Sequence, residues 1–166
     1  LLPEDPLRYQ KELNKQVDRK FRELCLEAIR NNVDFAFECN LRDNQIKYLS
    51  LFDEAGYKIN LVYLWLYDVE LSFERVEYRV AQGGHSVGKT SIESNFYEGL
   101  RNLNDSFQDW DNLFIIDNSK DIHKNNIENL PLVFYIVNGD IKYYNSNIDF
   151  NLIEKSFPEI ANKLNK

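Results

Sequence analysis

Apolar residues recur at helical spacing near the start of the chain and predict a long amphipathic helix over about residues 6–30. Charged residues separate the recurring positions, which are Leu13, Val17, Phe21, Leu24 and Ala28. The period then changes, because Val33, Phe35 and Phe37 alternate with small or polar residues. This alternation predicts a strand that ends near Glu38.

Two further helices are predicted around the most apolar run of the chain. The first runs from Asp43 to Ala55, and Gly56 suits its C-terminal cap. Residues 61–66 are continuously apolar, which is typical of a central parallel strand buried on both faces. Asp68 can cap the next helix, which Gly83-Gly84 ends.

The second half of the chain begins with another helix. Thr90-Ser91-Ile92-Glu93 has the sequence of a capping box, which predicts a helix that starts at Ser91. Residues 113–116 predict a short buried strand, and residues 120–129 predict a polar loop.

A β-hairpin is predicted near the C-terminus. Asn138-Gly139 separates the apolar runs 133–137 and 141–144, and this dipeptide is a strong signal for a tight turn. A final helix is expected from about Asn151. The order of elements predicts an α/β fold with a parallel sheet, in a single domain over residues 1–166.

Ligands of such sheets bind beyond the carboxyl ends of the strands, so three segments are candidates for a site. They are residues 38–42, 67–70 and 117–120. Each contains charged or amide side chains, whereas the predicted strands before them are mostly apolar.

Composition narrows the possible partners. The chain carries 20 Lys and Arg against 27 Asp and Glu, a formal charge of −7, which argues against non-specific binding of nucleic acid. A small phosphorylated ligand in a local basic pocket remains compatible. Cys25 and Cys39 are too few for a disulfide framework, and the longest apolar run is strand-sized. We therefore expect a cytoplasmic protein without a membrane or nucleic-acid partner.

Residues 83–90 satisfy the phosphate-loop pattern G-x-x-x-x-G-K-[ST]. In such a loop, backbone N–H groups and the lysine bind phosphates, and the hydroxyl binds Mg²⁺. The pattern requires a buried strand immediately before it, but residues 72–82 have helical spacing. A phosphate loop at Lys89 is therefore the less favoured hypothesis, and a capping box explains Thr90 equally well.

Arg75 and Arg79 are one helical turn apart and lead into a Gly-Gly-His turn that ends at His85. Composition alone favours a solvated helix face with Glu74 and Glu77 as local partners. The functional alternative is a mobile lid, since planar guanidinium groups bind phosphate oxygens with defined geometry. Phosphoryl transfer depends mainly on positioning and charge stabilisation, which lid arginines supply.

A series of short segments occurs in order over roughly residues 20–120. The segments are Phe35-Ala36-Phe37-Glu38-Cys39-Asn40-Leu41-Arg42, Ala55-Gly56-Tyr57-Lys58-Ile59, Leu64-Trp65-Leu66, Arg75-Val76-x-x-Arg79-Val80, Gln82-Gly83-Gly84-His85-Ser86-Val87, Ile92, Leu100-x-Asn102-Leu103 and Asp117-Asn118-Ser119. None is specific alone, but taken in this order they resemble the zeta-toxin family of P-loop kinases.

The resemblance implies a three-layer α/β fold with a parallel sheet of the P-loop kinase type. Its core would span residues 6–119 with a lid at about 75–95, and residues 130–166 would form the C-terminal hairpin and helix. It also implies transfer of the γ-phosphate of ATP or GTP to a small molecule, a UDP-amino sugar in typical members. The first strand, the true phosphate-binding loop and the Mg²⁺ ligands are expected outside this sequence, and an antitoxin protein is an expected partner.

The resemblance also assigns roles to individual residues. Arg75 and Arg79 match the lid arginines expected to be catalytic, and Arg79 is also expected to contact the nucleotide. The expected substrate-binding residues are Glu38, Asn40, Arg42 and His85. The expected nucleotide-binding residues at the end of a strand are Asp117, Asn118 and Ser119, and no metal ligand is expected within the sequence.

Two positions depart from the family pattern and keep a second hypothesis open. Asn40 stands where typical members often have Thr, and Asn95 stands where many relatives have a further arginine. Arg101 is a speculative spatial substitute for that arginine. The second hypothesis is a non-catalytic or truncated module that binds a protein partner such as an antitoxin.

Overall fold

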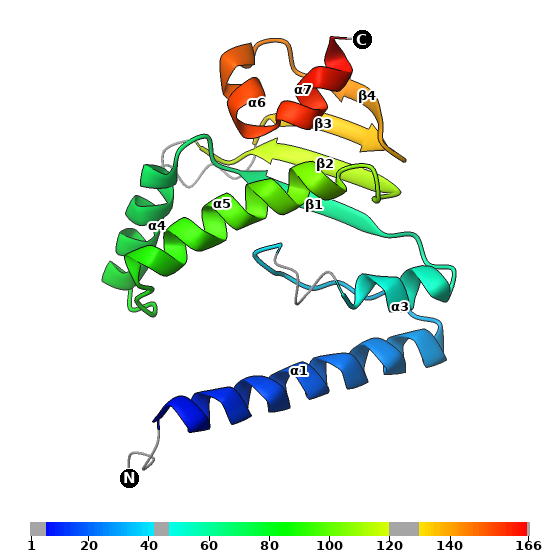
Figure 1. The fold of residues 1–166 in the computed structure, drawn as a ribbon, viewed down its shortest axis with the longest axis vertical. Coiled ribbons are helices and arrows are strands. Elements are labelled where there is room, and N and C mark those ends of the chain that lie inside the picture. The colour runs from blue at the N-terminus through cyan, green and yellow to red at the C-terminus, as the bar shows by residue number, and fades with distance from the viewer. Residues whose placement is uncertain (1–5, 42–46, 120–129, 166) are drawn as a thin grey trace. The chain divides into compact units, whose positions relative to one another are not determined.

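The computed structural model describes residues 6–41, 47–119 and 130–165, and of these the side chains from residue 8 onward. The chain forms two compact units, and Figure 1 labels their elements. The first unit comprises Leu1–Glu38 and Asn44–Lys58, and the second comprises Cys39–Asp43 and Ile59–Lys166. We describe each unit by itself, and the expectation of a single domain stays a prediction.

The first unit contains helices α1 (Pro6–Asn31) and α3 (Leu49–Glu54). The long N-terminal helix is confirmed, and it ends where Asn32 turns to a φ of 52°. An aromatic cluster holds the unit together, with the Phe21 ring of α1 at its centre. Its members are Phe21, Phe35, Phe37, Tyr48, Phe52 and Tyr57.

The predicted strand over residues 33–37 is wrong, because the described residues 33–41 contain no strand. The alternation itself is real, since Phe35 and Phe37 are half-buried and their neighbours are exposed. Their rings contact Phe21 of α1, with centroids 5.9 and 5.0 Å away. A strand also requires a hydrogen-bonded neighbour, and the described part of the first unit supplies none.

The predicted helix from Asp43 to Ala55 is found as the shorter α3, and residues 42–46 lie outside the described residues. Its predicted C-terminal cap is confirmed. Gly56 has a φ of 82°, its N–H donates to the Asp53 carbonyl at 2.8 Å, and the Tyr57 N–H donates to the Phe52 carbonyl at 3.0 Å.

The second unit is built on a four-stranded sheet in the order β1–β2–β3–β4. The strands are β1 (Asn60–Trp65), β2 (Asn112–Asp117), β3 (Leu132–Val137) and β4 (Asp140–Tyr144). Strands β1 and β2 are parallel, whereas the β2–β3 and β3–β4 pairs are antiparallel. The protein is therefore an α/β protein with a mixed sheet, and the all-parallel prediction holds only for β1 and β2.

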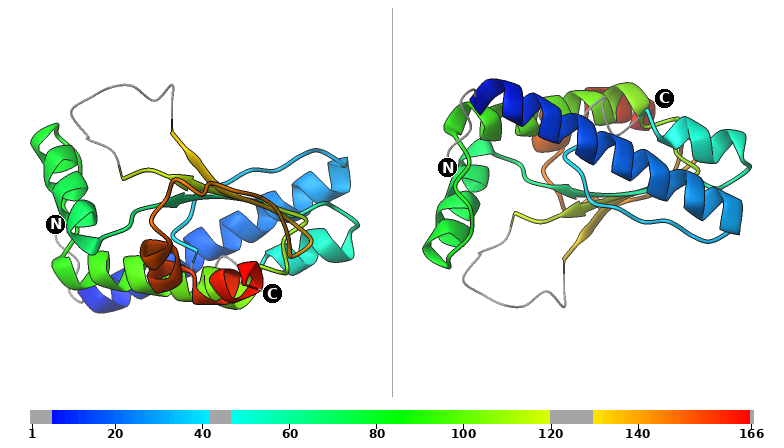
Figure 2. Two further views of the ribbon diagram at one scale, coloured as in Figure 1. Left: turned by 90° about the horizontal axis from the view of Figure 1, so that it is seen from above. Right: turned by 90° about the horizontal axis from the view of Figure 1, so that it is seen from below.

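Helices α5 (Lys89–Ser106), α6 (Phe150–Ser156) and α7 (Pro158–Leu164) lie on one face of this sheet, as Figure 2 shows. The core between the helices and the sheet contains fully buried side chains, among them Trp65, Leu103, Leu113, Ile115, Phe134, Ile136, Ile153, Phe157 and Ile160. Strand β1 is not the doubly buried central strand that its sequence predicts. It pairs only with β2 in the described residues, and Val62 and Leu64 are 57% and 51% exposed.

The C-terminal hairpin is confirmed. Asn138 and Gly139 join β3 to β4 with φ values of 47° and 77°, the left-handed values that this turn requires. The predicted final helix is two short helices, α6 and α7. The predicted polar loop 120–129 lies outside the described residues.

Helix α4 (Val69–Ala81) follows β1, and Asp68 caps it as predicted, accepting from the Glu70 N–H at 3.2 Å. The capping box predicted at Thr90 is wrong. Helix α5 begins at Lys89 with Gly88 as its N-cap and has no side-chain cap bond, so Thr90 already lies inside the first turn. Among the described helices, none is both long and apolar enough to cross a membrane.

Candidate functional site

The carboxyl ends of β1 and β2 are joined by hydrogen bonds at the predicted nucleotide-binding turn, residues 117–119. The Asn118 N–H donates to the Trp65 carbonyl at 2.8 Å, and the Tyr67 N–H donates to Ser119 Oγ at 3.1 Å. The Ser119 N–H donates to Asp117 Oδ1 at 2.8 Å, which is an Asx turn. The structure therefore brings the three predicted residues together at one edge of the sheet.

Arg75 of α4 also binds this turn. Its guanidinium donates to the Asn118 carbonyl oxygen and lies 3.5 Å from Asn118 Oδ1. Partial burial lowers the pKa of the Arg75 guanidinium from its usual value, and the charge of Asp117 opposes this change. Arg75 thus links the first half of α4 to the end of β2.

Arg79 lies one turn further along α4 and is exposed. The helix ends just after it, where Gly83 has a φ of 89° and the Gly84 N–H donates to the Arg79 carbonyl at 2.9 Å. A Cβ added to Gly84 would lie 2.7 Å from Arg79 Cγ, so the turn requires glycine there. His85 follows in the loop between α4 and α5 and is exposed.

Residues 83–88 lie between α4 and α5, so helix α4 precedes the pattern where a phosphate loop requires a strand. Lys89, the lysine of that pattern, is instead the first residue of α5. Its Nζ lies 5.7 Å from the centre of the Phe73 ring, a distance at which a cation is attracted to an aromatic face. The helical interpretation of residues 72–82 is confirmed.

The predicted substrate-binding residues are less closely connected. Glu38 is exposed and belongs to the first unit, in the segment where the predicted strand is missing. Asn40 belongs to the second unit and is exposed, whereas Arg42 lies outside the described residues. Of these three residues, Asn40 is the one that is described within the unit that contains the turn 117–119.

Helix α5 fixes the backbone around Asn40. The Asn102 side chain is buried, and its Nδ2 donates to the Leu41 carbonyl at 2.8 Å. Gly99 allows a close approach here, since a Cβ at this position would lie 3.2 Å from the Asn40 carbonyl oxygen. Leu41 is buried with a φ of 50°, a left-handed value that few side chains of its type adopt.

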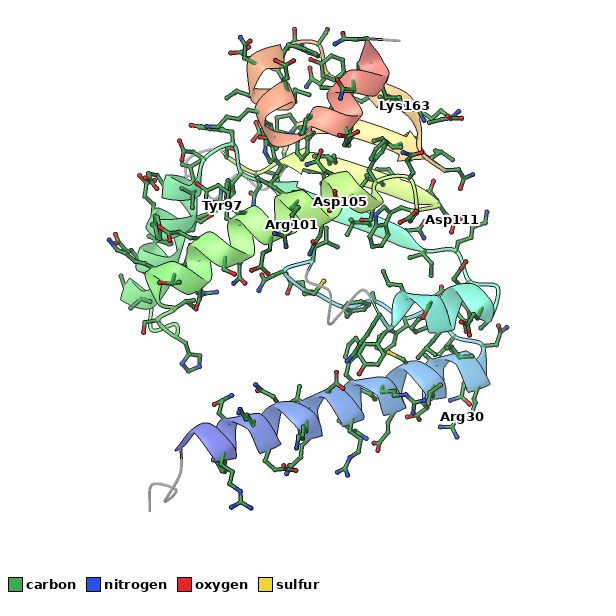
Figure 3. All side chains as sticks on the ribbon, viewed as in Figure 1. Arg30, Tyr97, Arg101, Asp105, Asp111 and Lys163 are labelled. Carbon is green, nitrogen blue, oxygen red and sulfur yellow. The ribbon has the colours of Figure 1, made fainter. Side chains whose placement is uncertain are left out.

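A pocket of about 360 Å³ lies beside the end of β1, where the chain enters α4. Tyr67 and Asp68 line it from that side, and Lys155 of α6 lines it from another. Tyr97, Arg101 and Asp105 follow one another along α5, as Figure 3 shows, and they also line this pocket. Arg101 therefore contributes to a pocket that the sequence does not predict.

The sequence analysis also missed the buried asparagines of α5. Asn102 anchors Leu41, and Asn104 Nδ2 donates to the Ser156 carbonyl at 2.8 Å, which ties α5 to α6. Both asparagines occupy positions beside Leu103, where a helix buries its apolar face. A polar residue within an apolar helical stripe is the signal that could have identified them, because a buried amide requires a hydrogen-bond partner.

A Mg²⁺ site has no counterpart in the described part of the chain. No group of three or more His, Cys, Asp and Glu side chains there lies close enough to hold a metal ion. The carboxylate of Asp117 is engaged with the Ser119 N–H within its own turn. The described residues therefore do not fit a complete metal site.

Comparison with known proteins gives one match. The family model described as zeta toxin matches residues 1–148 of this chain. Searches of curated proteins and of solved structures found no match. Because the family model spans most of its length, from α1 through the β-hairpin, the chain belongs to the zeta toxin family, and this membership implies a P-loop kinase.

Proposed function

We propose that this chain carries the lid and acceptor-binding part of a kinase that transfers the γ-phosphate of ATP or GTP to a small molecule. The zeta toxin match supports the kinase class and includes the whole α4–α5 segment. One structural observation carries the assignment of the lid. Arg79 is exposed in the last turn of α4, four residues before the first glycine of the pair that follows the helix.

Arg79 is the residue to which we assign charge neutralisation during transfer. Its guanidinium can donate several hydrogen bonds to phosphate oxygens in a fixed planar geometry. The Gly83-Gly84 turn lets the following loop change direction, so that the loop with His85 can close over a triphosphate bound by Arg79. In phosphoryl transfer such an arginine stabilises charge that develops in the transition state.

The family resemblance assigns acceptor binding to Glu38, Asn40, Arg42 and His85. A carboxylate and an amide suit a ligand rich in hydroxyl groups, because both accept hydrogen bonds from them. Asn40 is supported by the bond between Asn102 and the Leu41 carbonyl. A UDP-amino sugar, the acceptor that the family resemblance implies, is the first acceptor to test. Mg²⁺ is required for this class of reaction, and we assign no step to it because the described residues form no metal cluster.

The test is phosphotransfer by the full-length protein with ATP or GTP and UDP-amino sugars. We expect Arg79→Gln to lower kcat on the order of 10³-fold, as for other arginines that stabilise a phosphoryl transition state, with little change in the KM for nucleotide. Glu77→Gln is the control, since Glu77 is exposed on the same helix. Equal losses in kcat and nucleotide affinity would make Arg79 only a binding residue.

A non-catalytic module that binds a protein partner such as an antitoxin is the second candidate. Asn95 favours it, because an amide cannot replace the charge of the arginine that many relatives carry there. Val62 and Leu64 also favour it, as two apolar side chains that are more than half exposed on one strand. Absence of any nucleotide hydrolysis or transfer by the full-length protein would select this candidate over the kinase.

A further inference from the structure

Arg75 and Arg79 are equivalent in the sequence pattern but differ in their surroundings. Arg79 is exposed, whereas Arg75 is half-buried and donates to the Asn118 carbonyl. A backbone carbonyl is a permanent acceptor that does not depend on a bound ligand. Arg75 is therefore already engaged without nucleotide, and of these two arginines Arg79 is the exposed one.

The acceptor of Arg75 belongs to the network that joins the two parallel strands. The Asn118 N–H donates to Trp65 at the end of β1, and Ser119 accepts from the Tyr67 N–H. Tyr67 in turn lies directly before Asp68, the cap of α4. The chain from β1 into α4 and the end of β2 are thus connected through both backbone and side chains.

We propose that Arg75 is a positioning residue that holds the turn 117–119 and helix α4 as one rigid block, so that the moving part of the lid begins after the end of α4. This inference rests on the proposed kinase function and deepens it. It divides the two arginines of the lid by role, with Arg75 supporting the nucleotide-side turn and Arg79 acting on the phosphates. The hinge then lies at Gly83-Gly84 and not at the start of α4.

A lysine cannot replace Arg75 in this role. One guanidinium nitrogen, Nη2, donates to the Asn118 carbonyl oxygen and lies 3.5 Å from Asn118 Oδ1, and the rigid planar group fixes the position of this nitrogen. A lysine keeps the positive charge near Asp117 but has a single compact donor group. Arg75→Lys therefore separates the hydrogen-bond geometry from the charge.

Amide hydrogen exchange of the full-length protein, measured by NMR without nucleotide, tests the inference. The probes are the N–H groups of Tyr67 and Asn118, which form the two bonds between the strand ends. We expect Arg75→Lys and Arg75→Gln to speed their exchange at least about 10-fold, the factor expected when one hydrogen bond to a charged group is lost. Arg79→Lys is the matched control and should leave both rates unchanged.

Two further variants keep the test decisive. Asn118→Ala retains the backbone carbonyl that Arg75 binds, so it should change exchange much less than Arg75→Lys does. Ser119→Ala removes the acceptor of the Tyr67 N–H, and its effect should not add to that of Arg75→Gln, because both act on one network. Unchanged exchange in a folded Arg75→Lys protein, or full additivity with Ser119→Ala, would overturn the assignment.

Steady-state kinetics distinguish a positioning residue from one that only stabilises the fold, because only a positioning residue should change the KM for nucleotide. Arg75→Lys should raise the KM for nucleotide about 10-fold with kcat within about 3-fold of the unchanged protein, whereas Arg79→Lys should lower kcat. A fall in kcat with an unchanged KM in Arg75→Lys would contradict the positioning role. If the unchanged protein transfers no phosphate, the proposed function fails, while the exchange measurement still decides whether Arg75 holds the turn.

Discussion

The two units of this chain bury apolar side chains in different ways. In the first unit, α1 and the segment after it are held by contacts between aromatic rings, and the described residues contribute no strand. In the second unit, a sheet with a continuous hydrogen-bonded ladder carries the core. The candidate nucleotide-binding turn lies in the second unit, where the backbone is fixed on both sides.

This difference between the units shows which structural features an alternating apolar pattern determines and which it does not. Residues 33–37 and strand β2 both alternate between more and less buried side chains, but only β2 has neighbouring strands to which its backbone can bond. The pattern determines which side chains are buried, whereas the ladder depends on a partner from elsewhere in the chain. We therefore expect substitutions in the two units to reduce the free energy of unfolding by different amounts.

The largest effect is expected in the core of the second unit. Phe134 is completely buried, stacks on Tyr144 at 5.1 Å and meets the edge of Phe157 at 6.2 Å. Phe134→Ala should lower the free energy of unfolding by about 3–5 kcal/mol, measured by urea denaturation. Phe114→Ala is the matched control on the neighbouring strand, since Phe114 is only half-buried. An equal loss in both variants would mean that burial does not distinguish the two faces of the sheet.

A smaller effect is expected at the aromatic cluster of the first unit. Phe21 is half-buried but contacts three rings, with centroids 5.0–5.9 Å away. Phe21→Ala should cost about 2 kcal/mol, the contribution of burying one large apolar side chain. Tyr9→Ala, an exposed position on the same helix, should change stability by less than about 0.5 kcal/mol. If Phe21→Ala lowered the free energy of unfolding as much as Phe134→Ala does, the two units would not differ in how strongly their aromatic side chains stabilise them.

Local signals in the sequence predicted much of the fold. Asp68, Gly56 and Asn138-Gly139 each act through their own backbone or through the next two residues, so they could be identified without knowing the tertiary structure. The absence of a strand at residues 33–37 could not be recognised in this way, because the neighbour that a strand needs can come from a distant part of the sequence. The start of α5 was misplaced because Thr90 has a residue type that suits a cap, while the backbone places the cap at Gly88.

The sequence indicated the candidate residues of the site but not the contacts that these residues make. The family resemblance singles out Arg75, Arg79 and residues 117–119 as site residues, and the structure brings Arg75 to Asn118. The unequal surroundings of the two arginines follow from the direction of α4 relative to β2, which no local pattern specifies. The roles of Asn102 and Asn104 were missed for the same reason, since their hydrogen-bond acceptors lie 61 and 52 residues away.

A further loss of stability is expected at the contact between α5 and residues 40–41. Asn102 is 8% exposed, and its loss leaves the Leu41 carbonyl without this donor. Asn102→Ala should cost about 1–2 kcal/mol and speed proteolysis near residues 39–41. Asn104→Ala should cost a similar amount but loosen α6, to which Asn104 is bonded. Unchanged proteolysis near Leu41 in Asn102→Ala would contradict the anchoring role of α5.

The smallest effect is expected at the surface of the first unit, where Lys47 Nζ donates to Asp18 Oδ1 at 3.0 Å. Hydrogen bonds from Tyr48 and Lys47 lower the pKa of Asp18 from its ordinary value of 3.8. A carboxylate with a lowered pKa stabilises the folded state at a pH above its ordinary pKa, and this contribution disappears as the pH falls through the lowered value.

Asp18→Asn should therefore reduce the urea midpoint slightly and by a constant amount from about pH 5 to 8, and the difference should vanish near pH 2–3. High salt should also diminish it, because both side chains are about half exposed and their attraction is screened. Asp34→Asn, at an exposed position of the same unit, is the charge-matched control. A difference that persists at pH 2 would mean that Asp18 contributes through the shape of its side chain and not through its charge. The first unit would then depend on packing even at its surface, and its contrast with the hydrogen-bonded second unit would be sharper.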